Sequence, residues 1–298
     1  LGTHVDDAPY SAHVLRLLGG RDLSGVKIVL DAANGAGCAI APAVLSAAGA
    51  DVVVIAAEPD GRNINDGCGA TNPGFVAAAV VEHGADLGVA LDGDADRLIA
   101  VDHTGTVVDG DHIIAICAAD LRDRGQLAHD TVVVTVMTNL GFRLAMDAAG
   151  IKVVETGVGD RYVLEALGAG GHSLGGEQSG HVIFADHATT GDGLLTAVAL
   201  IDIVKRSGRT LADIACDAMT SLPQVLVNVR VGARVPDVAD RLADEIAMVE
   251  AELGATGRVL VRASGTEPLI RVMVEAATAI QAQAAADRLA DIARSKFS

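Results

Sequence analysis

The chain contains two copies of one pattern, in which a β-rich run is followed by a helical stretch and a second β-rich run. The first copy is VKIVLD, APAVLSAAG and DVVVIAA within residues 26–57, and the second is TVVVTVMTN, GFRLAMDAAG and IKVVET within residues 131–156. The copies align on AAG, with AAGADVV at 47–53 matching AAGIKVV at 148–154. Because strands that alternate with helices form parallel sheets covered by helices, we predict an α/β fold with two duplicated three-layer modules.

Each copy continues into a further apolar run that ends in a polar segment. These runs are ADLGVA at 85–90 and HSLGGE at 172–177. Open α/β sheets bind their ligands beyond the carboxyl ends of the strands. We therefore expect the binding residues of both modules directly after these two runs.

The part of the chain after residue 222 has a different pattern. We expect a strand at QVLVNVRV, a helix at 236–253, two strands at RVLVRAS and LIRVMVEA, and a closing helix at 279–296. Only a short segment around SGTEP separates the last two strands, which predicts a hairpin and a smaller α+β domain. The predicted domains are residues 1–106, 107–222 and 223–298, with a hinge before the third.

Composition excludes several classes of function. The net charge of −17 argues against nucleic-acid binding, which needs clustered Lys and Arg, and the aromatic content of 2% argues against a stacking surface. Because no apolar run is long enough to cross a bilayer, we expect a cytoplasmic protein without a membrane partner. The four cysteines are far apart and form no C-x-x-C pair, which indicates reduced thiols.

The segment GVALDGDADRLIAVD, residues 88–102, places Asp92, Asp94 and Asp96 in alternation after an apolar run and follows them with Arg97. On an extended strand the outer two carboxylates would stand about 13 Å apart, too far to share one ion. We therefore predict that the strand ends near Leu91 and that Gly93 and Ala95 let the chain curl into a metal loop. Magnesium ions prefer such closely held carboxylate oxygens.

Three other interpretations compete for this segment. An EF-hand needs Gly and Glu at loop positions where this chain has Arg97 and His103, so that interpretation fails. A phosphatase of the haloacid dehalogenase type, with the first Asp as nucleophile, and a solvated acidic turn both stay open. Three adjacent carboxylates repel one another unless a cation offsets their charge, which favours the metal loop.

Two further segments offer ligand-binding groups. SLGGEQSGHVIF, residues 173–184, presents Glu177 and Ser179 in a Gly-rich loop, and such carboxylate and hydroxyl groups suit the hydroxyls of a polyol. VRASGTEPLIRVMV, residues 261–274, surrounds a turn with arginines and forms a predicted anion site, whose residues are Arg262, Ser264, Gly265, Thr266 and Arg271. A plain glycine turn and a pair of surface arginines are the respective alternatives.

Asp192 stands directly before the helical stretch at 193–208. Aspartate is favoured at that position because its carboxylate accepts a hydrogen bond from a backbone N–H of the first turn. We interpret Asp192 as the helix cap, with a substrate contact as the alternative.

With these segments in this order, the chain resembles the α-D-phosphohexomutase superfamily. DGDADR resembles its metal loop, GEQSGH its sugar loop and RASGTEPLIR its phosphate loop. Relatives that act on mannose and glucose phosphates tend to have Met in place of Gln178. That residue and GVGDRYV at 157–163 are similar to the bacterial phosphoglucosamine mutase branch.

The resemblance implies a magnesium-dependent, reversible conversion of glucosamine 6-phosphate into glucosamine 1-phosphate, a step towards amino-sugar nucleotides and cell-wall precursors. In such enzymes a phosphoserine donates its phosphoryl group and a 1,6-bisphosphate forms as an intermediate. The implied roles are Mg²⁺ binding by Asp92, Asp94 and Asp96, contact with the transferring phosphoryl group by Arg97, sugar binding by Glu177 and Ser179, and binding of the other phosphate by Arg262, Ser264, Gly265, Thr266 and Arg271.

One departure from the superfamily bears on activity. Its members begin with a domain that carries the reactive serine in a T-A-S-H-N-P type segment, and the only Asn-Pro here, Asn72-Pro73, follows Ala-Thr without a serine. The chain, which does not begin with Met, therefore resembles domains two to four, and we expect no turnover from it alone. A phosphomannomutase or phosphoglucomutase and a non-catalytic sugar-phosphate-binding protein are the alternatives. The oligomeric state is left open, with a dimer of the full-length protein as one possibility.

Overall fold

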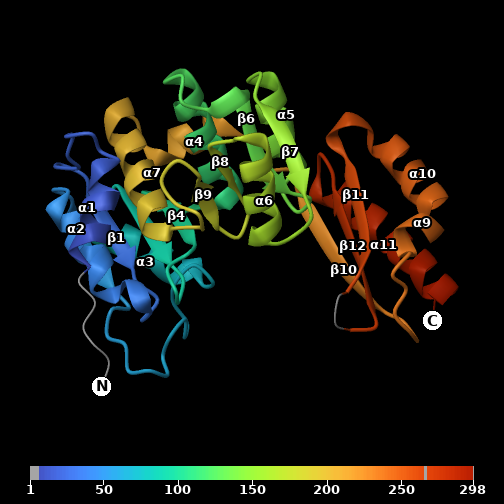
Figure 1. The fold of residues 1–298 in the computed structure, drawn as a ribbon. Helices are drawn as coiled ribbons and strands as arrows, with labels where there is room; N and C mark the ends of the chain where they lie inside the picture. The colour runs from blue at the N-terminus through green and yellow to red at the C-terminus, as the bar shows by residue number, and fades with distance from the viewer. Residues whose placement is uncertain (1–6, 265–266, 298) are drawn as a thin grey trace. The chain divides into compact units, whose positions relative to one another are not determined.

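The computed structural model describes residues 7–264 and 267–297 (Figure 1). Contacts between Cα atoms divide the chain into two compact units. The first unit runs as far as Thr138 and then from Phe142 to Met219. The second consists of Asn139–Gly141 and the chain from Thr220 onward.

The first sheet of the first unit has five strands in the order β2-β1-β3-β4-β5. Strand β1 is parallel to its neighbours β2 and β3, whereas β4 is antiparallel to β3, and β5 is antiparallel to β4. Its strands are β1 (Lys27–Asp31), β2 (Asp51–Ile55), β3 (Leu87–Leu91), β4 (Leu98–Asp102) and β5 (Val107–Val108). The helices in this part of the chain are α1 (Ala8–Arg16), η1 (Ala36–Cys38), α2 (Ile40–Ala47) and α3 (Pro73–His83).

The second sheet repeats this topology, with four strands in the order β7-β6-β8-β9. Here too the strand that comes first in the chain, β6, is parallel to its two neighbours β7 and β8, and the last strand, β9, is antiparallel to β8. The strands are β6 (Thr131–Thr135), β7 (Lys152–Thr156), β8 (Leu174–Gly176) and β9 (Val182–Phe184). The helices are α4 (Gly110–Asp123), η2 (Ala128–Asp130), α5 (Leu140–Ala148), α6 (Asp160–Gly170), α7 (Gly193–Ser207) and α8 (Leu211–Ala218). The duplication predicted from the AAG repeats is confirmed.

Both sheets are covered on two faces, which confirms the predicted three layers. In β1, Ile28 and Leu30 enter the largest hydrophobic cluster, whereas Val29 between them packs with Val76 and Val80 of α3. Successive side chains of a strand point to opposite faces, so this alternation means that both faces are buried. The second sheet has the same division: Val132 and Val134 enter the largest cluster, and Val133 packs with Val163 and Leu167 of α6.

The two modules of the first unit share one hydrophobic core. The largest cluster contains buried residues from β1 and β3 of the first sheet, from β6 and β8 of the second, and from α4 and α7. Every residue of α7 from Gly193 to Val204 is buried, as expected for a helix that packs against neighbours on all sides. The residue–residue contacts accordingly keep both modules in one compact unit.

The second unit is a small α+β fold, as predicted. Its antiparallel sheet has the order β10-β12-β11, and β11 and β12 form the expected hairpin. Its elements are β10 (Gln224–Arg230), α9 (Val238–Arg241), α10 (Ala243–Leu253), η3 (Gly254–Thr256), β11 (Arg258–Ala263), β12 (Leu269–Glu275) and α11 (Ala279–Phe297). The single helix predicted over 236–253 is divided, because Leu242 leaves helical geometry at φ −113° and ψ 15°. No helix in residues 7–264 or 267–297 is long and apolar enough to cross a membrane.

Candidate active site

The acidic segment after β3 forms a tight loop. The strand ends at Leu91, and the N–H of Ala95 donates to the carbonyl oxygen of Asp92 at 3.1 Å. Ala95 takes up the left-handed conformation, with φ +64°. Gly93 lies close to another segment: a Cβ there would lie 2.7 Å from Cδ1 of Ile64, so the Ile64 side chain would have to shift. The curl predicted from the sequence is present, with the turn at the alanine and the close approach at the glycine.

This loop brings the three predicted carboxylates together. One oxygen from each of Asp92, Asp94 and Asp96 lies within 4.8 Å of the others. Asp92 is 8% exposed, and its burial, followed by the charges of Asp96 and Asp94, raises the pKa of Asp92 to about 6. The loop therefore concentrates negative charge in a poorly solvated place, where a divalent cation lowers the electrostatic cost.

Arg97 lies beside this cluster and forms long ion pairs with two of its carboxylates. Its Nε is 3.8 Å from Oδ2 of Asp92 and 3.8 Å from Oδ1 of Asp96. This Nε atom makes no hydrogen bond with the described residues. Oδ1 of Asp96 is also buried and accepts no hydrogen bond in that part of the chain. Three carboxylates with a buried, unbonded oxygen fit a hard cation such as Mg²⁺, which prefers carboxylate oxygens.

The predicted sugar loop lies against the metal loop. Arg97 and His181 form an isolated antiparallel bridge, and the N–H of Leu98 donates to the carbonyl oxygen of Gly180 at 3.0 Å. Gly180 has φ +93°, and a Cβ there would lie 2.2 Å from the carbonyl oxygen of Leu98. Only glycine allows this approach, so the loop after β8 and the loop after β3 form one surface.

Glu177 and Gln178 of the sugar loop have fixed partners. Oε1 of Glu177 accepts a hydrogen bond from the N–H of Gly159 at 3.0 Å, which ties the carboxylate to the start of α6. Nε2 of Gln178 donates to Oδ2 of Asp109 at 3.3 Å, and Asp109 also caps α4. Ser179 is exposed at the tip. Glu177 and Ser179 thus belong to the same unit as the three carboxylates.

The predicted phosphate loop belongs to the second unit. Arg262 of β11 and Arg271 of β12 are direct cross-strand partners. Burial and the charge of Arg271 lower the pKa of Arg262, and Nε of Arg271 is buried without a hydrogen bond to the described residues. Ser264 is 2% exposed, whereas Gly265 and Thr266 lie outside the described residues. Two adjacent guanidiniums suit an anion that offsets their mutual repulsion.

Asp192 caps α7, as interpreted from the sequence. Its Oδ1 accepts a hydrogen bond from the N–H of Leu195 at 2.9 Å. The hydroxyl of Tyr10 donates to both carboxylate oxygens of Asp192, at 2.9 and 3.0 Å. The cap therefore also attaches α1 to α7.

Sequence reasoning gave no separate role to His181, Gly159 and Gly191, which hold these loops. His181 contacts Asp96 and Gly191, and Gly159 contacts Glu177. The signal for His181 and Gly159 was their place in GEQSGH and GVGDRYV. Their partners are 85 and 18 residues away along the chain, so the pairing could not be deduced from the motifs.

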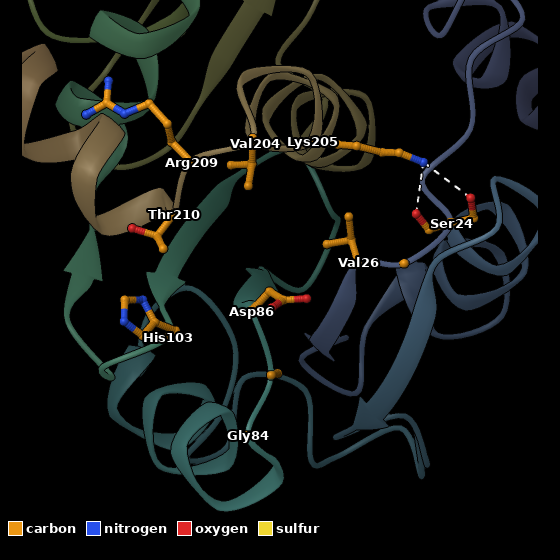
Figure 2. A pocket seen from close by; sticks show the side chains of 12 residues that line it. Ser24, Val26, Gly84, Asp86, His103, Val204, Lys205, Arg209 and Thr210 are labelled. Atoms are coloured by element: carbon orange, nitrogen blue, oxygen red, sulfur yellow. Dashed lines mark hydrogen bonds between the residues drawn. The ribbon is translucent and has the colours of Figure 1, made fainter.

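Two cavities of the first unit differ in their relation to these loops. A cavity of about 450 Å³ borders the metal loop and is lined in part by Asp94, Asp96, Thr190 and Asp192. A cavity of about 620 Å³ lies at the other end of the first sheet, beside Val26 and Asp86 just before β1 and β3 (Figure 2). Lys205 on its wall is already bound to Asp22 and Ser24. The cavity of about 450 Å³ is therefore the one that adjoins the candidate metal site.

Three family models match successive parts of the chain. They describe the phosphoglucomutase/phosphomannomutase α/β/α domain II at residues 9–105, α/β/α domain III at 109–222 and the C-terminal domain at 226–292. The chain belongs to the phosphoglucomutase/phosphomannomutase family. Both loops of the first unit lie within the matched domains II and III, and the arginine pair lies within the matched C-terminal domain.

Among curated members of this family, the chain is similar to bacterial phosphoglucosamine mutases. It is 58% identical over 288 residues to that of Streptomyces avermitilis, with 96% of this chain and 63% of the relative covered. It is 59% identical over 293 residues to that of Streptomyces coelicolor, with the same coverage. It is 57% identical over 291 residues to that of Kineococcus radiotolerans, with 97% and 64% covered. The chain thus spans about 63% of the length of these relatives.

Two solved structures share the fold of this chain. N-acetylphosphoglucosamine mutase of Aspergillus fumigatus, in complex with GlcNAc-6P and magnesium, matches with a TM-score of 0.78 and 22% identity over 97% of this chain and 65% of that chain. A family protein of Burkholderia thailandensis matches with a TM-score of 0.78 and 23% identity over 99% and 66%. At this level of identity the likeness establishes the architecture.

Proposed function

We propose that the chain carries the metal, sugar and distal-phosphate sites of a phosphoglucosamine mutase. The whole protein would interconvert glucosamine 6-phosphate and glucosamine 1-phosphate in the cytoplasm and so supply precursors of amino-sugar nucleotides and the cell wall. The observation that carries the proposal is the close approach of Asp92, Asp94 and Asp96 beside the sugar loop. The similarity to phosphoglucosamine mutases over 96% of the chain supports the choice of sugar.

In this proposal Asp92, Asp94 and Asp96 hold Mg²⁺, which offsets charge on the transferring phosphoryl group when bound. Arg97 adds a second positive charge beside that group, because its Nε is not committed to a hydrogen bond in the described part of the chain. The guanidinium binds phosphoryl oxygens and orients them for in-line transfer.

The sugar is held by the second loop of the first unit. Because Gly159 binds Oε1 of Glu177, we assign Oε2 of Glu177 to vicinal sugar hydroxyls, with the exposed hydroxyl of Ser179 beside it. Arg262, Ser264, Gly265, Thr266 and Arg271 are assigned to the phosphate that does not react. Such an anchor accepts the substrate in either of its two orientations.

The phosphoryl donor in this proposal is a phosphoserine of the whole protein. The serine phosphate passes its phosphoryl group to O1 of glucosamine 6-phosphate, which gives the 1,6-bisphosphate. After the intermediate turns over, the 6-phosphoryl group returns to the serine and leaves glucosamine 1-phosphate. The 298 residues contain no T-A-S-H-N-P segment, so we expect binding without turnover from this chain alone.

The test is ³¹P NMR of glucosamine 6-phosphate incubated with the whole protein, with Mg²⁺ or with EDTA. We expect conversion to the 1-phosphate only with Mg²⁺, and a higher kcat/KM than for glucose 6-phosphate or mannose 6-phosphate. A preference for either of those sugars would instead favour the phosphoglucomutase or phosphomannomutase alternative. Binding without conversion by the whole protein would favour a sugar-phosphate-binding protein. Turnover by the 298-residue chain alone would contradict the proposal that the reacting phosphoserine lies outside these residues.

A further inference from the structure

His181 lies between the two loops of the first unit and contacts both sides. It follows Gly180 at the end of the sugar loop and directly precedes β9, and the residue is 3% exposed. Its Nδ1 is 3.0 Å from Oδ2 of Asp96 in the metal loop. Its Nε2 is 3.0 Å from the backbone nitrogen of Gly191.

The contact with Gly191 fixes the tautomer of the ring. A backbone N–H can only donate, so Nε2 of His181 must accept and carries no proton. The proton of the neutral ring is therefore on Nδ1, which donates to Oδ2 of Asp96. The imidazole thus acts as a rigid link from the backbone of Gly191 to one chosen oxygen of Asp96.

This link leaves the two carboxylate oxygens of Asp96 in different surroundings. Oδ2 is occupied by His181, whereas Oδ1 is buried, lies 3.8 Å from Nε of Arg97 and accepts no hydrogen bond in the described part of the chain. A carboxylate can rotate about its Cβ–Cγ bond unless a second bond holds it. The bond from Nδ1 holds it with Oδ1 available to an ion.

Two glycines keep the link in place. A Cβ on Gly191 would lie 2.6 Å from Cε1 and Nε2 of His181, so any side chain there would displace the ring. The N–H of Gly193 donates to the carbonyl oxygen of Ala95 at 2.9 Å, and a Cβ there would lie 2.4 Å from the carbonyl oxygen of Arg97. The segment before α7 is therefore packed against both His181 and the metal loop.

We propose that His181 is a positioning residue, which orients Asp96 for Mg²⁺ from the neighbouring module and so makes metal affinity depend on the sugar loop. The role rests on the proposed metal assignment. Outer-shell partners of this kind typically change metal affinity by about 10–100-fold when they are removed. The ring does not touch the ion itself.

The experiment measures Mn²⁺ binding to the 298-residue chain by EPR, with Mg²⁺ as competitor. His181→Leu should weaken binding by roughly 10–100-fold. His181→Asn should stay within about threefold of wild type, because its amide N–H lies near the position of Nδ1, whereas His181→Gln places its amide near Nε2 and should bind as weakly as the Leu variant. The Asn and Gln pair keeps the test decisive even where His181→Leu does not fold.

His172→Leu is the matched control. His172 lies in the same module, two residues before β8 and so at the other end of that strand from the sugar loop, and its ring packs against that of His129 with centroids 5.8 Å apart. The Mn²⁺ affinity of the His172→Leu variant should equal that of wild type. Far-UV circular dichroism and Tm of every variant separate a lost fold from a lost orientation.

Asp94→Asn separates failure of the two proposals. If wild-type chain shows no saturable Mn²⁺ binding, or Asp94→Asn binds as wild type does, the metal assignment is wrong and the role of His181 falls with it. If Asp94→Asn weakens binding but folded His181→Leu and His181→Gln bind normally, only the positioning role is overturned. Equal losses in the Asn and Gln variants would overturn it as well, because the Nδ1 donor would then be irrelevant.

Discussion

Single residues hold the sugar loop through backbone geometry that a motif does not reveal. Gly159, the cap of α6, has φ 133° and ψ 135°, a conformation that side-chain-bearing residues avoid. Its N–H binds Oε1 of Glu177. There is space for a methyl group, since a Cβ on Gly159 would lie 3.5 Å from Cδ2 of Tyr162. The backbone conformation at residue 159 therefore requires glycine, whereas the space around it does not.

Gly159→Ala should lower the free energy of unfolding by about 1–3 kcal/mol, the cost of a strained backbone conformation. In the whole protein it should also raise KM for the sugar phosphate, because relaxation of the backbone moves the N–H away from Glu177. Urea denaturation and steady-state kinetics measure the two effects.

Gly168→Ala is the control for this prediction. Gly168 lies in the same helix α6 and has nothing within 4 Å of its added Cβ. That substitution should stabilise the chain by roughly 0.5–1 kcal/mol, as expected for an exposed helical glycine, and leave KM unchanged. Equal effects of the two substitutions would show that the conformation of Gly159 has no special role.

At the scale of elements, a buried carboxylate joins α7 to the chain before β1. Asp202 is 2% exposed and accepts hydrogen bonds from Arg21 and Arg206 at 2.8–2.9 Å. Burial alone would raise the pKa of Asp202, but the bonds from Arg21 and Arg206 outweigh it and lower the pKa. A folded-state pKa below the unfolded value stabilises the protein above the unfolded pKa, and this stabilisation is lost as the pH falls through the folded pKa.

Asp202→Asn should therefore lower the free energy of unfolding at pH 7 by about 3 kcal/mol, the low end for a broken buried ion pair because the Arg21 side chain is 41% exposed. The difference from wild type should shrink as the pH falls from about 4, the ordinary pKa of an unfolded aspartate, through the lower pKa of folded Asp202. Urea denaturation at a series of pH values measures it. Asp217→Asn removes an exposed pair with Arg209 and should change stability by less than about 0.5 kcal/mol at any pH.

The elements also show where sequence patterns reach their limit. The parallel strands and the hairpin were predictable because each has a local pattern of apolar periodicity and turn residues. The break at Leu242 was not, because ADRLADEI has no Gly or Pro to mark the end of a helix. The loop curl at Asp92–Asp96 was predictable from distance alone, whereas the hydrogen bond from His181 depends on a fold that brings two distant loops together.

At the scale of the molecule, the duplication suggests separate modules but packing joins them. Ile28 of the first sheet and Val132 of the second belong to one hydrophobic cluster, to which Leu200 of α7 also belongs. Val272 of β12 belongs to a different cluster within the second unit. Sequence periodicity identifies buried faces but cannot tell which buried faces meet, so this shared core was not predictable from the repeats.

Leu200→Ala should consequently destabilise both modules together. Leu200 is fully buried, so the substitution should cost about 2–5 kcal/mol. Because one core supports both sheets, native-state hydrogen exchange should show amides of β1 and β6 losing protection by the same amount, with β12 unchanged. Val272→Ala, equally buried but in the second unit, should reverse the pattern and lower protection in β12 alone. If Leu200→Ala lowered protection in β6 without affecting β1, the two modules would be separate folding units despite their common cluster.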